Sequence, residues 1–170
     1  MINIKEISES IINEVKSYLG SSEVIFAEQK GKKPKYPFVT MKITSPYIAE
    51  NGQGIITQDV VPSTNSNFEY DIEMTKAEMP KITISITTYS LDDIEAIELA
   101  MKCREWFNFK GYKFLDEKDL IVVDLSSIFN KDTLIVGDYE RRQGFDVILR
   151  TTDETKLVIE TIEEVDIRRE

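Results

Sequence analysis

Apolar and polar residues alternate most regularly near the middle of the chain. Residues 81–89 read KITISITTY, with isoleucine at alternate positions and mostly hydroxyl side chains between them. This period of two predicts a strand with one buried face. Residues 91–109 change to a helical period, which places Ile94, Ile97 and Met101 on one side of a helix, and we expect that side to face the core.

The helix that follows this strand has a clear beginning. Ser90 is the expected N-cap, and Asp92 and Asp93 lie in the first turn, where the positive end of the helix dipole favours carboxylates. A strand and the helix that covers it form two layers around one core.

The rest of the chain supplies one more helix and several more strands. Apolar residues recur at steps of three and four over residues 4–19, which predicts an amphipathic helix. Further strands are expected at 23–28, 36–44, 68–74, 120–125, 139–150 and 157–167. We therefore expect an α+β fold in one domain over residues 1–170: a mostly antiparallel, twisted sheet of about six to seven strands, with two main helices packed on one face.

Two short segments look like connections between neighbouring strands. Residues 30–35 carry four lysines around a glycine and a proline, which favours a solvated hairpin tip over a phosphate-contacting patch in so acidic a chain. Met79-Pro80 interrupts the alternation and predicts a hairpin or meander between the strands on either side. In the last strand, Ile162 faces away from its neighbours, which indicates a bulge or a second chain covering it.

A long polar segment, residues 45–67, is the expected exception to this compact plan. Loops of about 20 residues are uncommon in compact domains and are usually functional or disordered. Ile55, Ile56, Val60 and Val61 lie within it. They allow part of the segment to pair as a short strand or to dock on another protein.

Composition narrows the possible functions. The 170 residues carry a formal net charge of −10, which disfavours nucleic-acid binding over most of the surface. The chain contains no histidine and a single cysteine, Cys103, so an internal disulfide is impossible and the commonest general base is missing. No apolar stretch approaches the roughly 20 residues that cross a bilayer, and we expect neither a signal peptide nor a membrane partner.

Motifs for catalysis or cofactor binding are not evident in the sequence. There is no Ser-x-x-Lys, no Gly-x-Ser-x-Gly and no glycine cluster before a predicted helix. We therefore expect no catalytic residues, no metal site and no cofactor. A small enzymatic or ligand-binding α+β domain, with residues 45–67 as a lid, is the alternative.

Four segments of the chain resemble a known family. They are YPFVTMKI at 36–43, the strand at 82–89 with DDIEA at 92–96, YERRQGFDVIL at 139–149, and IETIE at 159–163. Together they are similar to the neck or tail terminator proteins of tailed bacteriophages and prophage-like elements. The resemblance covers most of the chain but not residues 45–67.

The resemblance implies a structural role in the virion. Proteins of this family form a ring, usually of six subunits, at the head-proximal end of the tail, where they stop tube polymerisation and join the tail to the head connector. The implied partners are further copies of the chain, a tail-tube protein and a head-completion or connector protein, with DNA passing through without tight binding. A tail-tube or head-completion protein is a further alternative.

We expect the subunit or partner contacts to involve the polar segment, the start of the 139–150 strand and the last strand. Arg141 and Arg142 are expected either to pair with a neighbour's carboxylates or to block unwanted pairing at a strand edge. The full set of candidate contact residues is Tyr47, Asn51, Gln53, Ile55, Ile56, Val60, Val61, Tyr139, Arg141, Arg142 and Ile162.

Overall fold

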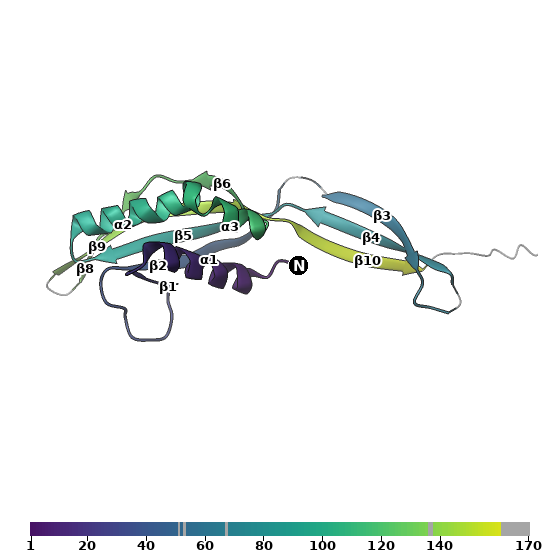
Figure 1. Cartoon of the computed structure of the whole chain (residues 1–170), viewed down its shortest axis with the longest axis horizontal. Helices are drawn as coiled ribbons and strands as arrows, with labels where there is room; N and C mark the ends of the chain where they lie inside the picture. The colour runs from purple at the N-terminus through teal and green to yellow at the C-terminus, as the bar shows by residue number, and fades with distance from the viewer. Residues whose placement is uncertain (51, 53, 67, 136–137, 161–170) are drawn as a thin grey trace, which may run out of the picture.

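The computed structural model describes residues 1–50, 52, 54–66, 68–135 and 138–160. Its helices are α1 (Ile4–Leu19), α2 (Asp93–Glu105), the short π-helix η1 (Trp106–Lys110) and α3 (Tyr112–Glu117). Its strands are β1 (Glu23–Phe26), β2 (Phe38–Ile48), β3 (Ile55–Pro62), β4 (Tyr70–Glu78), β5 (Lys81–Ser90), β6 (Ile121–Leu125), β7 (Phe129–Asn130), β8 (Thr133–Ile135), β9 (Asp138–Arg150) and β10 (Asp153–Glu160). Figure 1 shows that they form two parts, which we call the body and the arm.

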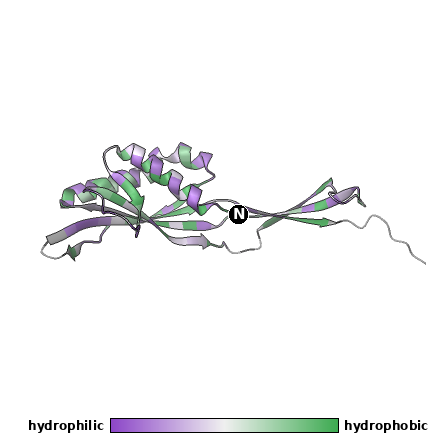
Figure 2. Ribbon diagram, turned by 90° about the horizontal axis from the view of Figure 1, so that it is seen from below, coloured by the Kyte–Doolittle hydropathy of each residue, from purple (hydrophilic) through white to green (hydrophobic). Residues whose placement is uncertain are grey.

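The body is a seven-stranded sheet covered by the helices. The strand order is β1-β2-β5-β9-β6, and β7 and β8 also pair with β9. All these pairs are antiparallel except β1 with β2. The helices lie together on one face of this sheet (Figure 2). The predicted α+β class and the mostly antiparallel sheet with helices on one face are confirmed.

The core of the body lies between the sheet and the helices. Ile82, Ile84 and Ile86 of β5 are each only 1% exposed, as their alternation predicts. Helix α1 has the predicted bounds, begins at an Asn3 side chain that accepts the Glu6 N–H, and buries its apolar side. The body therefore follows the sequence pattern closely.

Helix α2 differs from its prediction in two ways. Its N-cap is Asp92, whose carboxylate accepts the Glu95 N–H at 2.8 Å, and not Ser90, whose hydroxyl instead accepts the Asp92 N–H. The expected buried stripe was also wrong, because Ile94 is 62% and Met101 is 58% exposed.

The opposite side of α2 faces the sheet. Its buried residues are Ala96, Leu99, Ala100 and Cys103. The two alanines have short side chains, which let the helix approach the sheet closely, and the buried Trp106 and Phe107 continue the same side into η1. Both sides of α2 are apolar, so periodicity by itself did not distinguish them.

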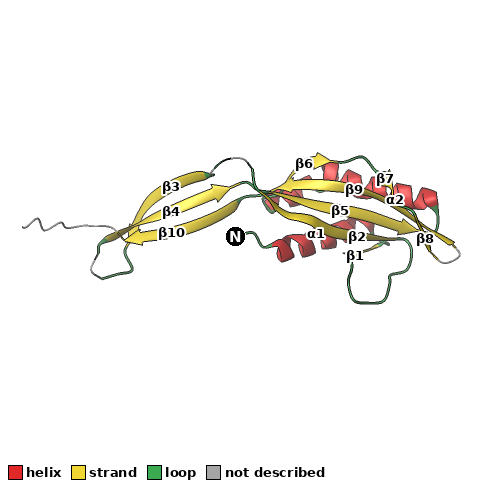
Figure 3. Ribbon diagram, turned by 180° about the vertical axis from the view of Figure 1, so that it is seen from behind, coloured by secondary structure: helices red, strands yellow, loops and turns green. Residues whose placement is uncertain are grey.

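The arm is a second sheet of three strands in the order β10-β4-β3. It extends away from the body along the long axis of the molecule (Figures 1 and 3). The chain passes between body and arm three times, at residues 49–54, 79–80 and 151–152. Because β2 leads to β3, β5 follows β4 and β9 leads to β10, the three arm strands continue the three central body strands.

The fold overturns three of the expectations from sequence. Residues 45–67 are not one long loop, since they hold the end of β2 and all of β3; the alternative that Ile55 to Val61 pair as a strand is confirmed. Strands β4 and β5 do not form a hairpin or meander, since Met79-Pro80 carries the chain from one sheet to the other. The lysine-rich segment 30–35 is no hairpin tip, because β1 and β2 are parallel.

The last strand is described only in part. Strand β10 begins at Asp153, earlier than expected, and is described as far as Glu160. The expected bulge and Ile162 lie outside the described residues.

Candidate assembly surfaces

The arm has one apolar face and one charged face. Residues paired across antiparallel strands point to the same side of a sheet. The register puts Val60, Ile72 and Ile159 side by side, and Gln58, Met74 and Leu157 in the adjacent row on the same side. We call this side the apolar arm face; its members are Ile56, Gln58, Val60, Pro62, Tyr70, Ile72, Met74, Lys76, Thr155, Leu157 and Ile159.

The other side of the arm is charged. It carries Asp59, Asp71, Glu73 and Glu154 with one lysine, Lys156, whose ammonium lies 2.7 Å from the Glu73 carboxylate. The same side also carries Ile55, Val61 and Val158, and its Asp71 is only 2% exposed, so the two faces of the arm differ mainly in their charge.

The apolar arm face is open within the described part of the chain. Val60 is 71% exposed, Leu157 is 59% and Ile56 is 51%. None of the described helices lies over it, and Figure 2 shows hydrophobic residues along uncovered arm strands. An antiparallel sheet normally packs its apolar side on a core. Large exposed apolar patches on soluble proteins are typical of interaction sites, which makes this face a candidate.

A second open apolar surface lies on the body. The outer side of α2 carries Ile94, Ile97 and Met101, opposite the buried alanines, and we call these three residues the α2 ridge. Ile94 and Met101 are well exposed and Ile97 is half-buried. Exposed Glu98 and Glu105 belong to the same side of the helix. A helix that is apolar on two sides is usually buried on both.

A buried carboxylate organises the end of the body farthest from the arm. Glu140 in β9 is 3% exposed and accepts hydrogen bonds from Lys33, Tyr36 and Arg142. Burial by itself raises the pKa of Glu140, but these donors outweigh it and hold the pKa below the usual range of glutamate. The Arg142 guanidinium also lies 5.1 Å from the centre of the Tyr89 ring.

The neighbouring arginine is held in a similar way. Arg141 donates to the Asp132 carboxylate at 3.1 Å, and the Arg142 N–H donates to the other oxygen of the same group at 2.7 Å. Both arginines expected at an interface are therefore bonded within the chain. A contact with a neighbour's carboxylate would add to these ion pairs or replace them.

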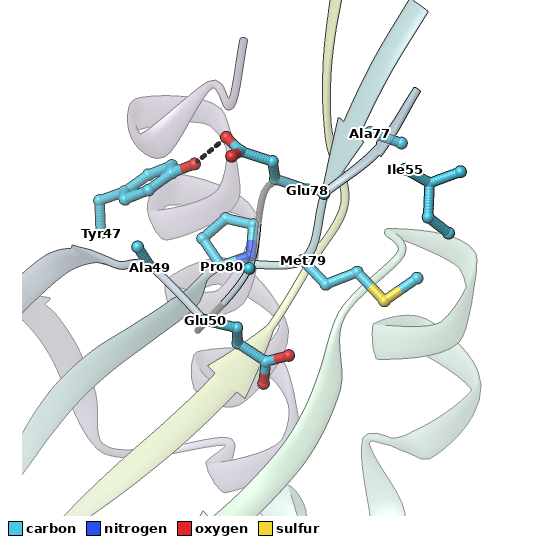
Figure 4. Close-up of a pocket in the computed structure, with 10 residues that line it drawn as sticks. Tyr47, Ala49, Glu50, Ile55, Ala77, Glu78, Met79 and Pro80 are labelled. Atoms are coloured by element: carbon cyan, nitrogen blue, oxygen red, sulfur yellow. Dashed lines mark hydrogen bonds between the residues drawn. The ribbon is translucent and has the colours of Figure 1, made fainter. Parts of the chain in front are cut away.

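A small hollow lies where the arm joins the body, and we call this region the waist. Figure 4 shows its lining, which includes Tyr47, Glu50 and Met79. The hollow has a volume of about 170 Å³, below the roughly 300–1,000 Å³ of typical small-molecule sites. Its polar side chains already bond to partners in the chain: Tyr47 donates to Glu78 at 3.0 Å, and the Glu50 carboxylate lies 2.9 Å from the Lys81 ammonium.

These contacts brace the waist. The Thr151 N–H also donates to the Pro80 carbonyl at 3.2 Å, which ties two of the three crossing points together. Burial and the hydrogen bond to Glu78 raise the pKa of Tyr47. The residues around the hollow therefore connect the two sheets, and the polar side chains of Tyr47 and Glu50 are bonded to protein partners.

The expected contact residues fall into separate places. Tyr47 lies at the waist, and the arm holds the residues from β3, of which Ile56 and Val60 lie on the apolar face while Ile55 and Val61 lie on the charged face. Arg141 and Arg142 lie in β9 at the far end of the body, as does the backbone of Tyr139. Asn51, Gln53 and Ile162 lie outside the described residues.

Sequence reasoning missed several residues of these surfaces. The strands that hold the β4 and β10 members of the apolar arm face were expected in the one sheet that the helices cover, because strict alternation does not say what covers the apolar side. The α2 ridge was assigned to the core for the same reason. One signal was available: α2 has apolar residues on two opposite sides, more than one sheet can cover.

Two negative findings concern the described residues. None of the helices in this part of the chain is both long and apolar enough to cross a membrane. Within the same residues, no three acidic, cysteine or histidine side chains gather in a way that could hold a metal ion.

A comparison with curated protein sequences found no match. The family model described as "Phage neck terminator protein" matches residues 7–170, nearly the whole chain. The protein therefore belongs to the phage neck terminator family.

Proposed function

We propose that the chain forms a closed ring, with six copies in the assembled state, at the head-proximal end of a phage tail. The ring stops polymerisation of the tail tube and joins the tail to the head connector. Its partners are further copies of itself, the tail-tube protein and a head-completion or connector protein. It acts in the neck of the virion and performs no catalysis.

The observation that carries this proposal is the apolar arm face. Val60, Leu157 and Ile56 in this three-stranded sheet are each more than half exposed. Folding of the isolated arm therefore buries little apolar surface and gains little stability. The sequence keeps this face apolar in three separate strands, which makes sense if the arm is covered in an assembly. A family of neck proteins supplies the setting in which such an assembly forms.

The shape of the molecule supports a ring in particular. An extended arm and a body at opposite ends give each copy two different surfaces to offer, as Figure 1 shows. Contacts between unlike surfaces generate closed rings when the rotation between copies closes. Termination then follows from geometry: one face of the ring matches the last ring of the tube, and the other matches the connector.

The charge of the chain suits a channel through which DNA passes. The net charge of −10 repels phosphate groups over most of the surface. We therefore expect duplex DNA to pass the ring without being gripped. Tight, salt-sensitive binding of DNA to the purified protein would contradict this part of the proposal.

The ligand-binding alternative has less support. It requires a concave site with converging polar groups, and the waist hollow is small, with Tyr47 and Glu50 bonded to neighbouring side chains. A larger hollow of about 340 Å³ lies at the far end of the body, but the polar groups that line it, Lys33, Glu140 and Arg142, bond to one another.

The proposal is tested by polymerising the cognate tail-tube protein in the presence of the purified chain. We expect shorter tubes as the ratio of this protein to tube protein rises, with a ring of extra density at one end by negative-stain electron microscopy. Bovine serum albumin at equal concentration is the control. Tubes of unchanged length without end density, at a molar excess of the chain, would reject the proposed function.

A further inference from the structure

Two apolar surfaces of this chain are open and lie in different parts of it. The apolar arm face belongs to β3, β4 and β10, and the α2 ridge belongs to the helical layer of the body. The arm points away from the body, so the two surfaces of one copy do not meet (Figures 1 and 3). Within the described residues of one copy, nothing covers either surface.

We propose that each surface covers the other in adjacent copies: the apolar arm face of one copy packs on the α2 ridge of the next. This inference rests on the proposed ring and adds the residues that hold it together. The contact is heterologous, because the two copies contribute different surfaces. One copy contributes Val60 with Ile72 and Ile159 beside it, and the neighbour contributes Ile94 and Met101.

Size supports this pairing. From Ile94 to Glu105 the ridge side of α2 runs about 16 Å, at a rise of about 1.5 Å per residue. From Ile56 to Pro62 the arm face runs about 20 Å, at about 3.3 Å per residue. A strand face of this length and three strands in width can cover the ridge from end to end.

Charge decides which arm face approaches the helix. Carboxylates of Glu98 and Glu105 flank the α2 ridge, and the Tyr18 hydroxyl donates to Glu105 at 3.2 Å. From Ile56 to Pro62 and across the paired strands, the only charged residue of the apolar arm face is Lys76, which is paired at 2.7 Å with Glu78; Glu78 and Asp153 form the next row of this side, nearer the waist. The charged arm face would bring several carboxylates against the same helix, so only the apolar face fits.

The pattern of α2 itself points to the same contact. One side of the helix, which includes Ala96, Ala100 and Cys103, is buried against the sheet. The opposite side would need no isoleucine or methionine if it faced only water. Covering it with the arm of the next copy gives both apolar sides of the helix a packing partner.

The test uses two variants that each remove one half of the contact. Val60→Asp puts a charge on the arm face, and Ile94→Asp puts one on the ridge. Thr57→Asp, on the charged face of the same strand, and Asn13→Asp, at an exposed position of α1, are the matched controls. Near-ultraviolet circular dichroism and urea unfolding establish that each variant is folded.

We expect Val60→Asp and Ile94→Asp each to raise the concentration at which rings form by at least 10-fold, measured by sedimentation velocity and native mass spectrometry. The two controls assemble as the wild type does. A 1:1 mixture of the two variants is decisive, because one partner still has its ridge and the other still has its arm. The mixture should give dimers that grow no further.

A crosslinking measurement covers the case in which a charged variant does not fold. Val60→Cys and Ile94→Cys copies, mixed at tens of micromolar and treated with a short bis-maleimide, should form a covalent dimer. Thr57→Cys with Ile94→Cys should not. The native Cys103 is buried, and its burial raises its pKa to about 12, so it does not compete.

The outcomes separate this inference from the proposed function. Full rings from either charged variant at the concentration at which the wild type forms them, rings from the 1:1 mixture, or no Val60–Ile94 crosslink would overturn the arm-to-ridge contact while tube termination stands. Rings that respond as expected but never stop tube growth would keep the contact and reject the function.

Discussion

The body and the arm are both built from strands with an alternating pattern, and the outcome is opposite in the two. In the body, Ile82, Ile84 and Ile86 of β5 are each 1% exposed, because helices cover that side of the sheet. In the arm, Val60 and Leu157 occupy equally apolar alternating positions and stay 71% and 59% exposed. Along the chain, the strands of the two sheets are separated only by the short connections at residues 49–54, 79–80 and 151–152.

This contrast shows that an alternating pattern identifies an apolar side but not its cover. In the body the cover is encoded in the same chain, as α1 and α2. In the arm the described chain supplies none, and the surface is left for another molecule. Four predictions test whether body and arm differ in this way, and they run from the largest expected effect on stability to the smallest.

The largest effect is expected in the core of the body. Phe145 is fully buried, with its ring centre 6.4 Å from that of Phe107. Phe145→Ala should lower the free energy of unfolding by about 3–5 kcal/mol, because it removes a large side chain and leaves a cavity. Urea unfolding followed by tryptophan fluorescence measures this. Phe109→Ala, at a position 69% exposed, is the control and should change stability by less than about 0.5 kcal/mol.

The second effect concerns the buried carboxylate of the body. Glu140→Gln should cost about 2 kcal/mol, because Lys33 and Arg142 lose a charged acceptor. The folded pKa of Glu140 is lowered, so its contribution is complete above the unfolded value of about 4.3 and falls as the pH drops through the folded value.

This pH dependence gives the measurement. Urea midpoints between about pH 3 and pH 6 should fall less steeply on acidification in Glu140→Gln than in the wild type. Exposed Glu117, 3.8 Å from Lys113, supplies the control Glu117→Gln, which should leave the profile unchanged. Identical profiles for Glu140→Gln and the wild type would mean that this cluster does not stabilise the body.

The third effect on stability concerns Gly54, which directly precedes strand β3 of the arm. Gly54 has a φ of +75°, and a Cβ there would lie 2.6 Å from the Ala77 carbonyl oxygen of the adjacent strand. Gly54→Ala should cost about 1–2 kcal/mol through strain and displacement of β3 from β4. Hydrogen exchange should speed up in β3 and stay unchanged in β5. Gly31→Ala, where nothing lies within 4 Å of the added Cβ, is the control, and equal exchange in β3 for both variants would contradict the prediction.

The smallest effect on the isolated chain is expected on the apolar arm face. Val60→Ser should change the free energy of unfolding by less than about 0.5 kcal/mol, because the side chain it replaces is mostly exposed. The same variant should weaken ring assembly measurably. A loss of several kcal/mol from the monomer would show that Val60 is covered within its own chain.

Much of the body could be predicted from local pattern. Helix α1 was predicted with its observed bounds, and β5 with its buried isoleucines, because each has one apolar side and one polar side. Helix α2 was located but turned the wrong way, since Ile94 and Met101 point outward while Ala96 and Ala100 face the sheet. Larger side chains suggested the core, whereas close packing against the sheet required the smaller ones.

The arm could be predicted only in pieces. Alternation in β4 was plain, but Met79-Pro80 is equally compatible with a hairpin and with a crossing between two sheets. Strand β3 was hidden in a polar segment, because Ile55, Ile56, Val60 and Val61 point to both faces of a sheet that is open on both sides. Of the expected contact residues, Arg141 and Arg142 proved to be bonded within the chain, and nothing in their local sequence named Asp132 and Glu140 as acceptors.

The sequence by itself determined the α+β class, the apolar side of regularly alternating strands such as β4 and β5 and, through family resemblance, the kind of protein. Only the tertiary structure decided that the strands divide into two sheets and that one apolar sheet face and one helix side stay open. The reason is physical: periodicity is a property of neighbouring residues, whereas burial depends on what distant residues bring to the other side of the contact.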